Sequence, residues 1–317
     1  MIKVIATGGT ITNSPAGRLA ADEAVAQLPQ VAAIAEIRVD EVHRVASSAL
    51  GIDDMVGISN AVNRTFADEP NVEGIVITVG SNQSEDLAYY LNLTVSSSKP
   101  VVVTAAQRRR GTLSEDASRN FVDAVVTATS QDSANKGVVL VANELIHPAR
   151  EVTKNVVSRV DSWQSPDTGA LGIVSGGEAI FYRAPLRRHT MDSEFSGKRV
   201  TSASELPKVE IIYSYADADP VIVDAAVQQA GARGLVVAAF ATGAPHTGQA
   251  TALVSAVEEH GVTVAISNRG SSGRIPPDCH PFVGADNLRP QKAMILLKLA
   301  LSLTDDASEV QRIFNEY

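Results

Sequence analysis

The sequence contains little cysteine, no long uncharged apolar run and no excess of positive charge. Cys279 is the only cysteine among 317 residues, which excludes an internal disulfide, and we interpret it as a small hydrophobic residue. No stretch reaches the roughly 18 apolar residues that a membrane-spanning helix needs. Met1 is followed at once by the strand-like run Ile2–Ala6, and not by the basic and apolar regions of a signal peptide. We therefore expect a cytoplasmic protein that does not contact a membrane.

The balance of charge is acidic. Lys and Arg number 27 and Asp and Glu number 36, which gives a net charge of −9. A compact acidic chain repels phosphate backbones, so we expect no nucleic-acid partner. The one basic run, Arg108–Arg110, is too short to change this, although it is suited to lining an anion site. With 44% hydrophobic and 20% charged residues, the chain also lacks the composition of a disordered protein.

Several common kinds of site are missing from the sequence. No Gly-x-Gly-x-x-Gly motif follows the first predicted strand, and there is neither a P-loop nor a Gly-x-Ser-x-Gly elbow. One cysteine cannot form a zinc cluster, so only the histidines remain as typical zinc ligands. These lack paired metal-ligand spacing: His43, His147, His189, His246, His260 and His280. We expect no metal and no cofactor.

Short apolar runs alternate with Ala-rich helical stretches along the chain. The predicted strands are Ile2–Ala6, Gly74–Thr78, Val101–Ala105, Gly137–Val141, Val209–Tyr213, Gly234–Ala238 and Val262–Ile266. The predicted helices are Ala21–Leu28, Asp53–Phe66, Glu85–Thr94, Ser114–Ser130, Ala218–Gln229, Gln249–Glu259 and Gln291–Leu303. Continuous apolar strands are typical of parallel sheets buried on both faces, and this alternation predicts an α/β fold.

One polar stretch without a clear period, from Arg183 to Lys208, interrupts the pattern and carries Pro185 and Pro207. We interpret it as an interdomain linker. The predicted organisation is a larger N-terminal α/β domain with a mainly parallel sheet (residues 1–184), a linker (185–206) and a smaller C-terminal α/β domain (207–317).

Polar residues follow the ends of several predicted strands, where ligands bind in open α/β sheets. These segments are Thr7–Ile11, Gly80–Asp86, Gln107–Arg110 and Asn143–Asn155. Each has an ordinary structural explanation: a glycine turn, a helix cap at Ser81 or a solvated Lys154. Together, on one edge of a sheet, they indicate a site. Because a hydroxyl nucleophile without a histidine needs another activator, Lys154 is the candidate base.

The sequence resembles the bacterial-type L-asparaginase/glutaminase family over nearly its whole length. The matching segments are Ala6–Ile11, Gly80–Asn82, Glu85–Val95, Lys99–Val102, Arg150–Lys154, Leu206–Val209 and Pro290–Ala293. The resemblance implies two α/β domains, a homotetramer with active sites formed between subunits of an intimate dimer, and acyl transfer from a small-molecule amide without a cofactor.

Residue by residue, the resemblance implies that Thr10 is the nucleophile, that Ser81 replaces a second catalytic threonine, and that Lys154 activates through a hydrogen-bonded chain. Backbone N–H groups near Thr10 and Ser81 would stabilise the oxyanion. We expect Lys154 to lie against Ser81 without a carboxylate close by and to have a depressed pKa. The expected substrate contacts are Gly9, Ser14, Asp53, Gly80, Asn82 and Gln107.

The chain departs from the family pattern around the substrate. Ser14 occupies the place of a catalytic loop tyrosine, and Asn82 replaces the aspartate that holds the α-ammonium of the amino acid. Ile52 and Asp53 replace a polar pair, and Arg108 and Arg109 stand nearby as possible contacts for a new carboxylate. Asn82 removes the anion that would pair with the α-ammonium, so the pattern favours a substrate whose α-ammonium is absent or masked.

Three functions agree with these residues. The first is hydrolysis of a side-chain amide of the L-asparagine type to a carboxylate and ammonia. The second is a binding or regulatory protein on the same scaffold with weakened catalysis, which the retained Thr10 and Lys154 disfavour. The third is a lyase or racemase on the same fold.

Overall fold

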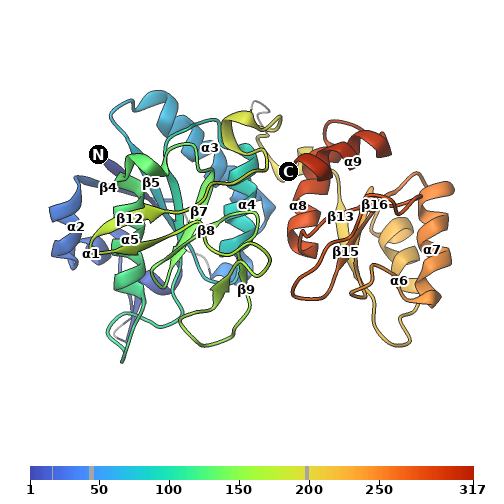
Figure 1. Cartoon of the computed structure of the whole chain (residues 1–317), viewed down its shortest axis with the longest axis horizontal. Helices are drawn as coiled ribbons and strands as arrows, with labels where there is room; N and C mark the ends of the chain where they lie inside the picture. The colour runs from blue at the N-terminus through green and yellow to red at the C-terminus, as the bar shows by residue number, and fades with distance from the viewer. Residues whose placement is uncertain (16, 43–45, 197–199) are drawn as a thin grey trace. The chain divides into compact units, whose positions relative to one another are not determined.

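The computed structural model describes residues 1–15, 17–42, 46–196 and 200–317. The chain forms two compact units, Met1–Thr201 and Ser202–Tyr317 (Figure 1). Each unit is an α/β structure with its own sheet and its own hydrophobic core. Among the described residues, no helix is long and apolar enough to cross a membrane.

The first unit is built on an eight-stranded sheet of order β12-β11-β8-β7-β6-β5-β1-β4. Five neighbouring strands are parallel: β1 (Ile2–Ala6), β4 (Ile37–Glu41), β5 (Gly74–Thr78), β6 (Val101–Thr104) and β7 (Val138–Ala142). Three further strands extend the sheet antiparallel: β8 (Leu145–Pro148), β11 (Gly172–Ser175) and β12 (Glu178–Phe181). Four of the five parallel strands, all except β4, are buried along their whole length. This is why they are continuous apolar runs in the sequence.

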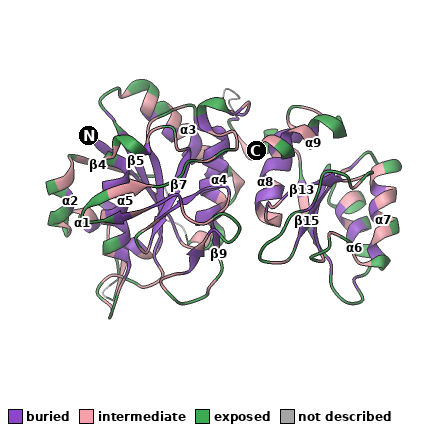
Figure 2. Cartoon of the chain, in the orientation of Figure 1, coloured by how far each residue is buried: buried purple, intermediate pink, exposed green. Residues whose placement is uncertain are grey.

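Helices cover both faces of this sheet. They are α1 (Ala21–Ala26), α2 (Pro29–Ile34), α3 (Ile52–Asp68), α4 (Ser84–Thr94) and α5 (Ala117–Thr129). The α5 helix packs its apolar side on β5, β6 and β7, whereas α4 packs on β6 and β7 and is itself buried over nearly all of its length (Figure 2). The deep burial of α4 fixes the position of the loop that precedes it, residues 79–83.

The second unit has a smaller parallel sheet of order β13-β14-β15-β16. Its strands are β13 (Val209–Tyr213), β14 (Gly234–Ala239), β15 (Thr263–Asn268) and β16 (Val283–Gly284). Its helices are α6 (Val221–Asp224), continued by a π-helical turn (Ala225–Gln229), α7 (Thr247–Glu258), α8 (Pro290–Leu301) and α9 (Ala307–Glu316). Gly231 and Gly261 follow two of these helices with φ of 69° and 64°, as left-handed helix ends require.

The predicted helix Ser114–Ser130 begins later than expected, at Ala117. The carboxylate of Asp116 accepts the backbone N–H groups of Gln107 and Arg108, at 3.0 and 2.7 Å. Ser114 has a φ of 52°, which a helix does not allow. The residues before Ala117 therefore belong to the loop after β6, and the prediction of a helix there was wrong.

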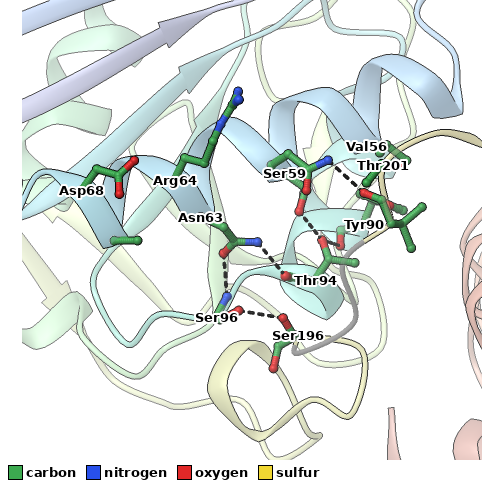
Figure 3. A pocket seen from close by; sticks show the side chains of 13 residues that line it. Val56, Ser59, Asn63, Arg64, Asp68, Tyr90, Thr94, Ser96, Ser196 and Thr201 are labelled. Carbon is green, nitrogen blue, oxygen red and sulfur yellow. Dashed lines mark hydrogen bonds between the residues drawn. The ribbon is translucent and has the colours of Figure 1, made fainter.

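The described residues of the segment after β12, up to residue 196 and again at 200–201, belong to the first unit. The segment lies beside a polar groove of about 670 Å³ between α3 and α4 (Figure 3). The Ser96 hydroxyl donates to the carbonyl of Ser196 at 2.7 Å, and the Asn60 amide donates to the carbonyl of Val200 at 2.9 Å. The side chain of Asn63 forms hydrogen bonds that link α3 to the end of α4. The boundary between the units, after Thr201, lies inside the predicted linker.

Candidate active site

Two neighbouring strands bring the first two predicted site segments together. β1 and β5 are parallel, with Ala6 opposite Thr78, so the chain leaves both strands at the same edge of the sheet. Beyond the last pair, Thr7 donates its backbone N–H to the carbonyl of Thr78 at 3.0 Å, and its hydroxyl donates to the same oxygen at 2.9 Å. The turn at residues 8–10 and the turn at residues 79–81 therefore begin side by side.

The two turns touch at a pair of glycines. A Cβ atom at Gly9 would lie 2.6 Å from the backbone nitrogen of Gly80, and Gly9 has a φ of 97°. A Cβ atom at Gly80 would in turn lie 2.5 Å from the side chain of Ser47. Only glycine allows this approach of one backbone to the other. Gly9 and Gly80, predicted as substrate contacts, thus have a structural role in setting the distance between the turns.

Thr10 opens a short 3-10 turn, Thr10–Thr12, directly after Gly9. Ile11 and Thr12 are buried and anchor the turn, and the Thr12 hydroxyl donates to the carbonyl of Gly9 at 3.2 Å. Thr10 itself is partly exposed. The predicted nucleophile therefore has an accessible position on a backbone that is fixed on both sides.

Ser81 and Lys154 are in direct contact. The ammonium nitrogen of Lys154 lies 2.8 Å from the hydroxyl oxygen of Ser81. Lys154 ends the short strand β9 (Thr153–Lys154), which pairs antiparallel with β10 (Trp163–Gln164). Burial lowers the pKa of Lys154, while the negative charge of Glu85 raises it by a smaller amount. The structure thus brings together two residues that are 73 positions apart in the sequence.

The surroundings of Lys154 include two residues that the sequence analysis did not select. The carboxylate of Glu85 accepts the backbone N–H of Lys154 at 3.3 Å, and the ring centroid of Trp163 lies 5.9 Å from its ammonium nitrogen. The indole N–H of Trp163 donates to the hydroxyl of Ser84 at 2.9 Å, and that hydroxyl donates to the carbonyl of Ser81 at 3.1 Å. The expectation that no carboxylate lies close to Lys154 was therefore wrong.

The side-chain amide of Gln107 is engaged in holding a loop. It donates to the carbonyls of Val156 and Val157, each at 3.2 Å, and to the hydroxyl of Ser162. These acceptors lie between β9 and β10, so Gln107 ties the loop after β6 to the hairpin that carries Lys154. Its assignment as a substrate contact stays a prediction.

The remaining predicted contacts lie at the surface. Asn82 is exposed in the turn before α4, and Asp53 is exposed in the first turn of α3. The Ser14 hydroxyl donates to the carbonyl of Gly17 at 2.8 Å, across the two-stranded hairpin of β2 (Asn13–Ser14) and β3 (Gly17–Arg18). Their roles stay predictions.

The two arginines proposed for a carboxylate contact are also at the surface. The Arg108 guanidinium donates to the carbonyl of Ser114 at 3.0 Å, and the Arg109 side chain is exposed.

Among the described residues, no cluster of three or more His, Cys, Asp or Glu side chains is arranged to hold a metal ion.

Comparison with known proteins agrees with this architecture. Residues 1–187 match the family model described as "Asparaginase, N-terminal", and residues 208–314 match "Glutaminase/Asparaginase C-terminal domain". The whole chain is 34% identical to a glutaminase-asparaginase of Pseudomonas fluorescens biotype A and to L-asparaginase 2 of Escherichia coli, covering 90% and 93% of those proteins. Its structure is similar to the crystal structure of a probable cytoplasmic L-asparaginase from Campylobacter jejuni, with a TM-score of 0.93, 33% identity, and coverage of 100% and 99% of the two chains.

The two α/β units and the similarity to L-asparaginases and glutaminase-asparaginases identify an asparaginase-like amidohydrolase, a hydrolase that acts on amide carbon–nitrogen bonds. The chain belongs to the asparaginase/glutaminase family. The predicted family and fold class are thereby confirmed, and the binding-protein and lyase or racemase alternatives are not favoured.

Proposed function

We propose that this enzyme hydrolyses a side-chain amide through an acyl-enzyme intermediate on Thr10. The Thr10 oxygen attacks the amide carbonyl carbon and gives up its proton. The carbon–nitrogen bond then breaks, and the leaving nitrogen takes up that proton and departs as ammonia. Water then attacks the ester, so that the carboxylate is released and the Thr10 hydroxyl is restored. The accessible position of Thr10 on a fixed turn supports this role.

The observation that carries the proposal is the contact of 2.8 Å between Lys154 and Ser81. When Lys154 is neutral, its nitrogen accepts the proton of the Ser81 hydroxyl, and Ser81 in turn accepts the proton that leaves the nucleophile or the attacking water. Burial favours the neutral amine by lowering the pKa of Lys154. The pair is thus suited to act as a base without a histidine.

The oxyanion of the tetrahedral intermediate is stabilised, in this proposal, by backbone N–H groups beside Thr10 and Ser81. Because Gly9 and Gly80 are packed against each other, the N–H groups of the two turns are held in fixed positions before the substrate arrives. Donors that need no rearrangement contribute most to the stabilisation of developing charge.

The substrate, we propose, is an amide whose α-ammonium is absent or masked. The relatives named above are called L-asparaginases and glutaminase-asparaginases, and the family aspartate that holds the ammonium is Asn82 here. Gly9, Ser14, Asp53 and Gly80 would complete the contacts, and Gln107 would contribute its side-chain oxygen, since its amide nitrogen is engaged with the β9–β10 loop.

The proposal extends to assembly and location. We propose a homotetramer built from intimate dimers, domains at residues 1–184 and 207–317 joined by a linker, and a cytoplasmic location. The similarity to the probable cytoplasmic L-asparaginase of C. jejuni supports the location. Sedimentation velocity of the purified chain tests the tetramer directly.

The function is tested by ammonia release from a panel of carboxamides that includes L-asparagine, L-glutamine and succinamate, with imides and lactones as further compounds. We expect stoichiometric release of ammonia and carboxylate from at least one carboxamide. Product formation without ammonia, or binding without turnover of any compound, would contradict the proposal.

A further inference from the structure

Lys154 is surrounded by three groups from three different elements. Ser81 faces it from the turn after β5, Glu85 from the first turn of α4, and Trp163 from β10. Among these groups only Glu85 carries a charge.

The Glu85 side chain is buried, with the residue 7% exposed. One carboxylate oxygen accepts the Lys154 backbone N–H, while the other has no hydrogen-bond partner among the described residues. A buried carboxylate oxygen without a donor is rare, because its desolvation is not compensated. Its first-turn position in α4 offers only partial compensation through the helix dipole. A nearby cation is what would offset the remaining cost.

The effect of that charge opposes the effect of burial. Burial favours the neutral amine of Lys154, and the Glu85 charge favours its ammonium form, with burial the larger effect on the pKa. The face of an indole ring also favours a cation, and the Trp163 centroid is 5.9 Å from the nitrogen. Burial on one side, and Glu85 and Trp163 on the other, therefore act in opposite directions on the protonation of the group that the proposed function uses as a base.

We propose that Glu85 is a positioning residue for Lys154: its carboxylate fixes the lysine backbone, and its negative charge controls how readily the ammonium gives up its proton. This inference rests on the proposed function of Lys154 as a base, and it assigns to Glu85 the electrostatic control of that base. Glu85 does not itself touch the reacting atoms in this account.

The two parts of the role are separable because glutamine has nearly the same shape as glutamate. In Glu85→Gln the side-chain oxygen still accepts the Lys154 N–H, whereas the charge is lost. We therefore expect a folded protein in which Lys154 loses its proton at a lower pH, by roughly one pH unit. A purely structural Glu85 would leave the protonation of Lys154 unchanged.

The single tryptophan of the chain provides a readout that does not depend on activity. Because Trp163 is the only tryptophan, and its ring lies beside the Lys154 nitrogen, its fluorescence should change when that nitrogen gains or loses a proton. The experiment is a pH titration of fluorescence excited at 295 nm in the wild-type protein and in Glu85→Gln. In Lys154→Met the transition should be absent, which assigns it.

Glu178→Gln is the matched control, since Glu178 is an exposed glutamate on β12. We expect its titration midpoint to equal that of the wild type and the Glu85→Gln midpoint to be lower. Equal midpoints in wild type and Glu85→Gln would overturn the inference, and so would a higher midpoint in the variant. If Glu85→Gln does not fold, Glu85→Asp takes its place in the experiment. A fluorescence midpoint and a kcat equal to those of the wild type would then overturn the proposed role of Glu85.

Activity forms a second arm of the same experiment. The acid limb of kcat/KM should move to lower pH in Glu85→Gln by the same amount as the fluorescence midpoint. If the midpoint moves but no amide is hydrolysed by the wild type, the role of Glu85 stands and the proposed function fails. If the wild type hydrolyses an amide and shows the fluorescence transition, but neither the midpoint nor the acid limb moves in Glu85→Gln, then Glu85 is only structural and the inference fails.

Discussion

At the scale of single residues, the site depends on contacts between residues that are far apart in the sequence. Thr10, Ser81 and Lys154 could be selected from the sequence, because the resemblance to the family implies a catalytic role for each of these positions. Glu85 and Trp163 could not, since their relation to Lys154 spans 69 and 9 positions and exists only in the folded chain. Glu85 looks like an ordinary acidic residue of a first helical turn.

The contact between Ser81 and Lys154 predicts that the two act as a unit. Lys154→Met and Ser81→Ala should each lower kcat/KM by about 10²–10⁴-fold, the usual contribution of a positioned acid–base group. The double variant should be little worse than either single variant, because each change already breaks the same proton transfer. The measurement is steady-state ammonia release by all four proteins. Losses that multiply in the double variant would show that the residues act in separate steps.

The environment of Lys154 predicts the direction of the pH dependence. A base must be neutral, so kcat/KM should rise with pH as Lys154 loses its proton. Because burial lowers the pKa of Lys154, this rise should be centred below the ordinary value of 10.5. The limb should disappear in Lys154→Arg, whose guanidinium stays protonated. A limb that persists there would assign the titration to another group.

At the scale of elements, the buried parallel strands were predictable. The antiparallel strands, the parallel strand β4, which has no fully buried residue, and the two-residue strand β16 were not. Strands such as β5 and β7 are buried on both faces and are therefore uninterrupted apolar runs. By contrast, β12 is partly exposed, and β8 contains a histidine and ends in proline. The turns between these strands use left-handed residues at Asn143–Glu144 and Gly176–Gly177, which local sequence does not reveal without the structure.

The glycine pair between the two turns gives a prediction for this scale. Gly9→Ala should destabilise the fold more than Gly17→Ala does. Both glycines have positive φ, of 97° and 125°, which costs an alanine about 1–3 kcal/mol. Only at Gly9 does the new Cβ atom meet the backbone, whereas nothing lies within 4 Å of it at Gly17.

Urea unfolding of the two variants measures this difference. We expect Gly9→Ala to lose at least about 1 kcal/mol more than Gly17→Ala, and to lose activity because the two turns are pushed apart. Equal losses of stability would mean that the Gly9–Gly80 approach is not required for the fold.

At the scale of the whole molecule, the two-unit α/β architecture and the family followed from ordered motifs spread along the chain, and both are confirmed. The exact division of the chain is less evident from the sequence. Residues 190–196 are mostly polar, yet Phe195 is 1% exposed and the carbonyl of Ser196 accepts the Ser96 hydroxyl. Burial of a few side chains in a polar segment leaves no periodic signal.

Substrate choice is also a property of the whole enzyme, and Asn82 predicts its direction. Removing a charged partner from a fully buried ammonium costs about 3–5 kcal/mol, or about two to four decades of affinity, and the loss at the exposed Asn82 should be smaller. We expect kcat/KM to be higher for succinamate than for L-asparagine. Asn82→Asp should raise the value for L-asparagine relative to succinamate. A clear preference of the wild type for L-asparagine would show that its ammonium is still recognised.

The most direct test of the account is the activity of Thr10→Ala on the amide that the wild type hydrolyses fastest, with Thr10→Ser beside it. Thr10 is partly exposed and its hydroxyl contributes little to packing, so both variants should unfold like the wild type. We predict that Thr10→Ala loses at least about 10³-fold in kcat/KM, while Thr10→Ser, which keeps a hydroxyl, retains measurable turnover. Ammonia release by Thr10→Ala at a rate near that of the wild type would contradict the account.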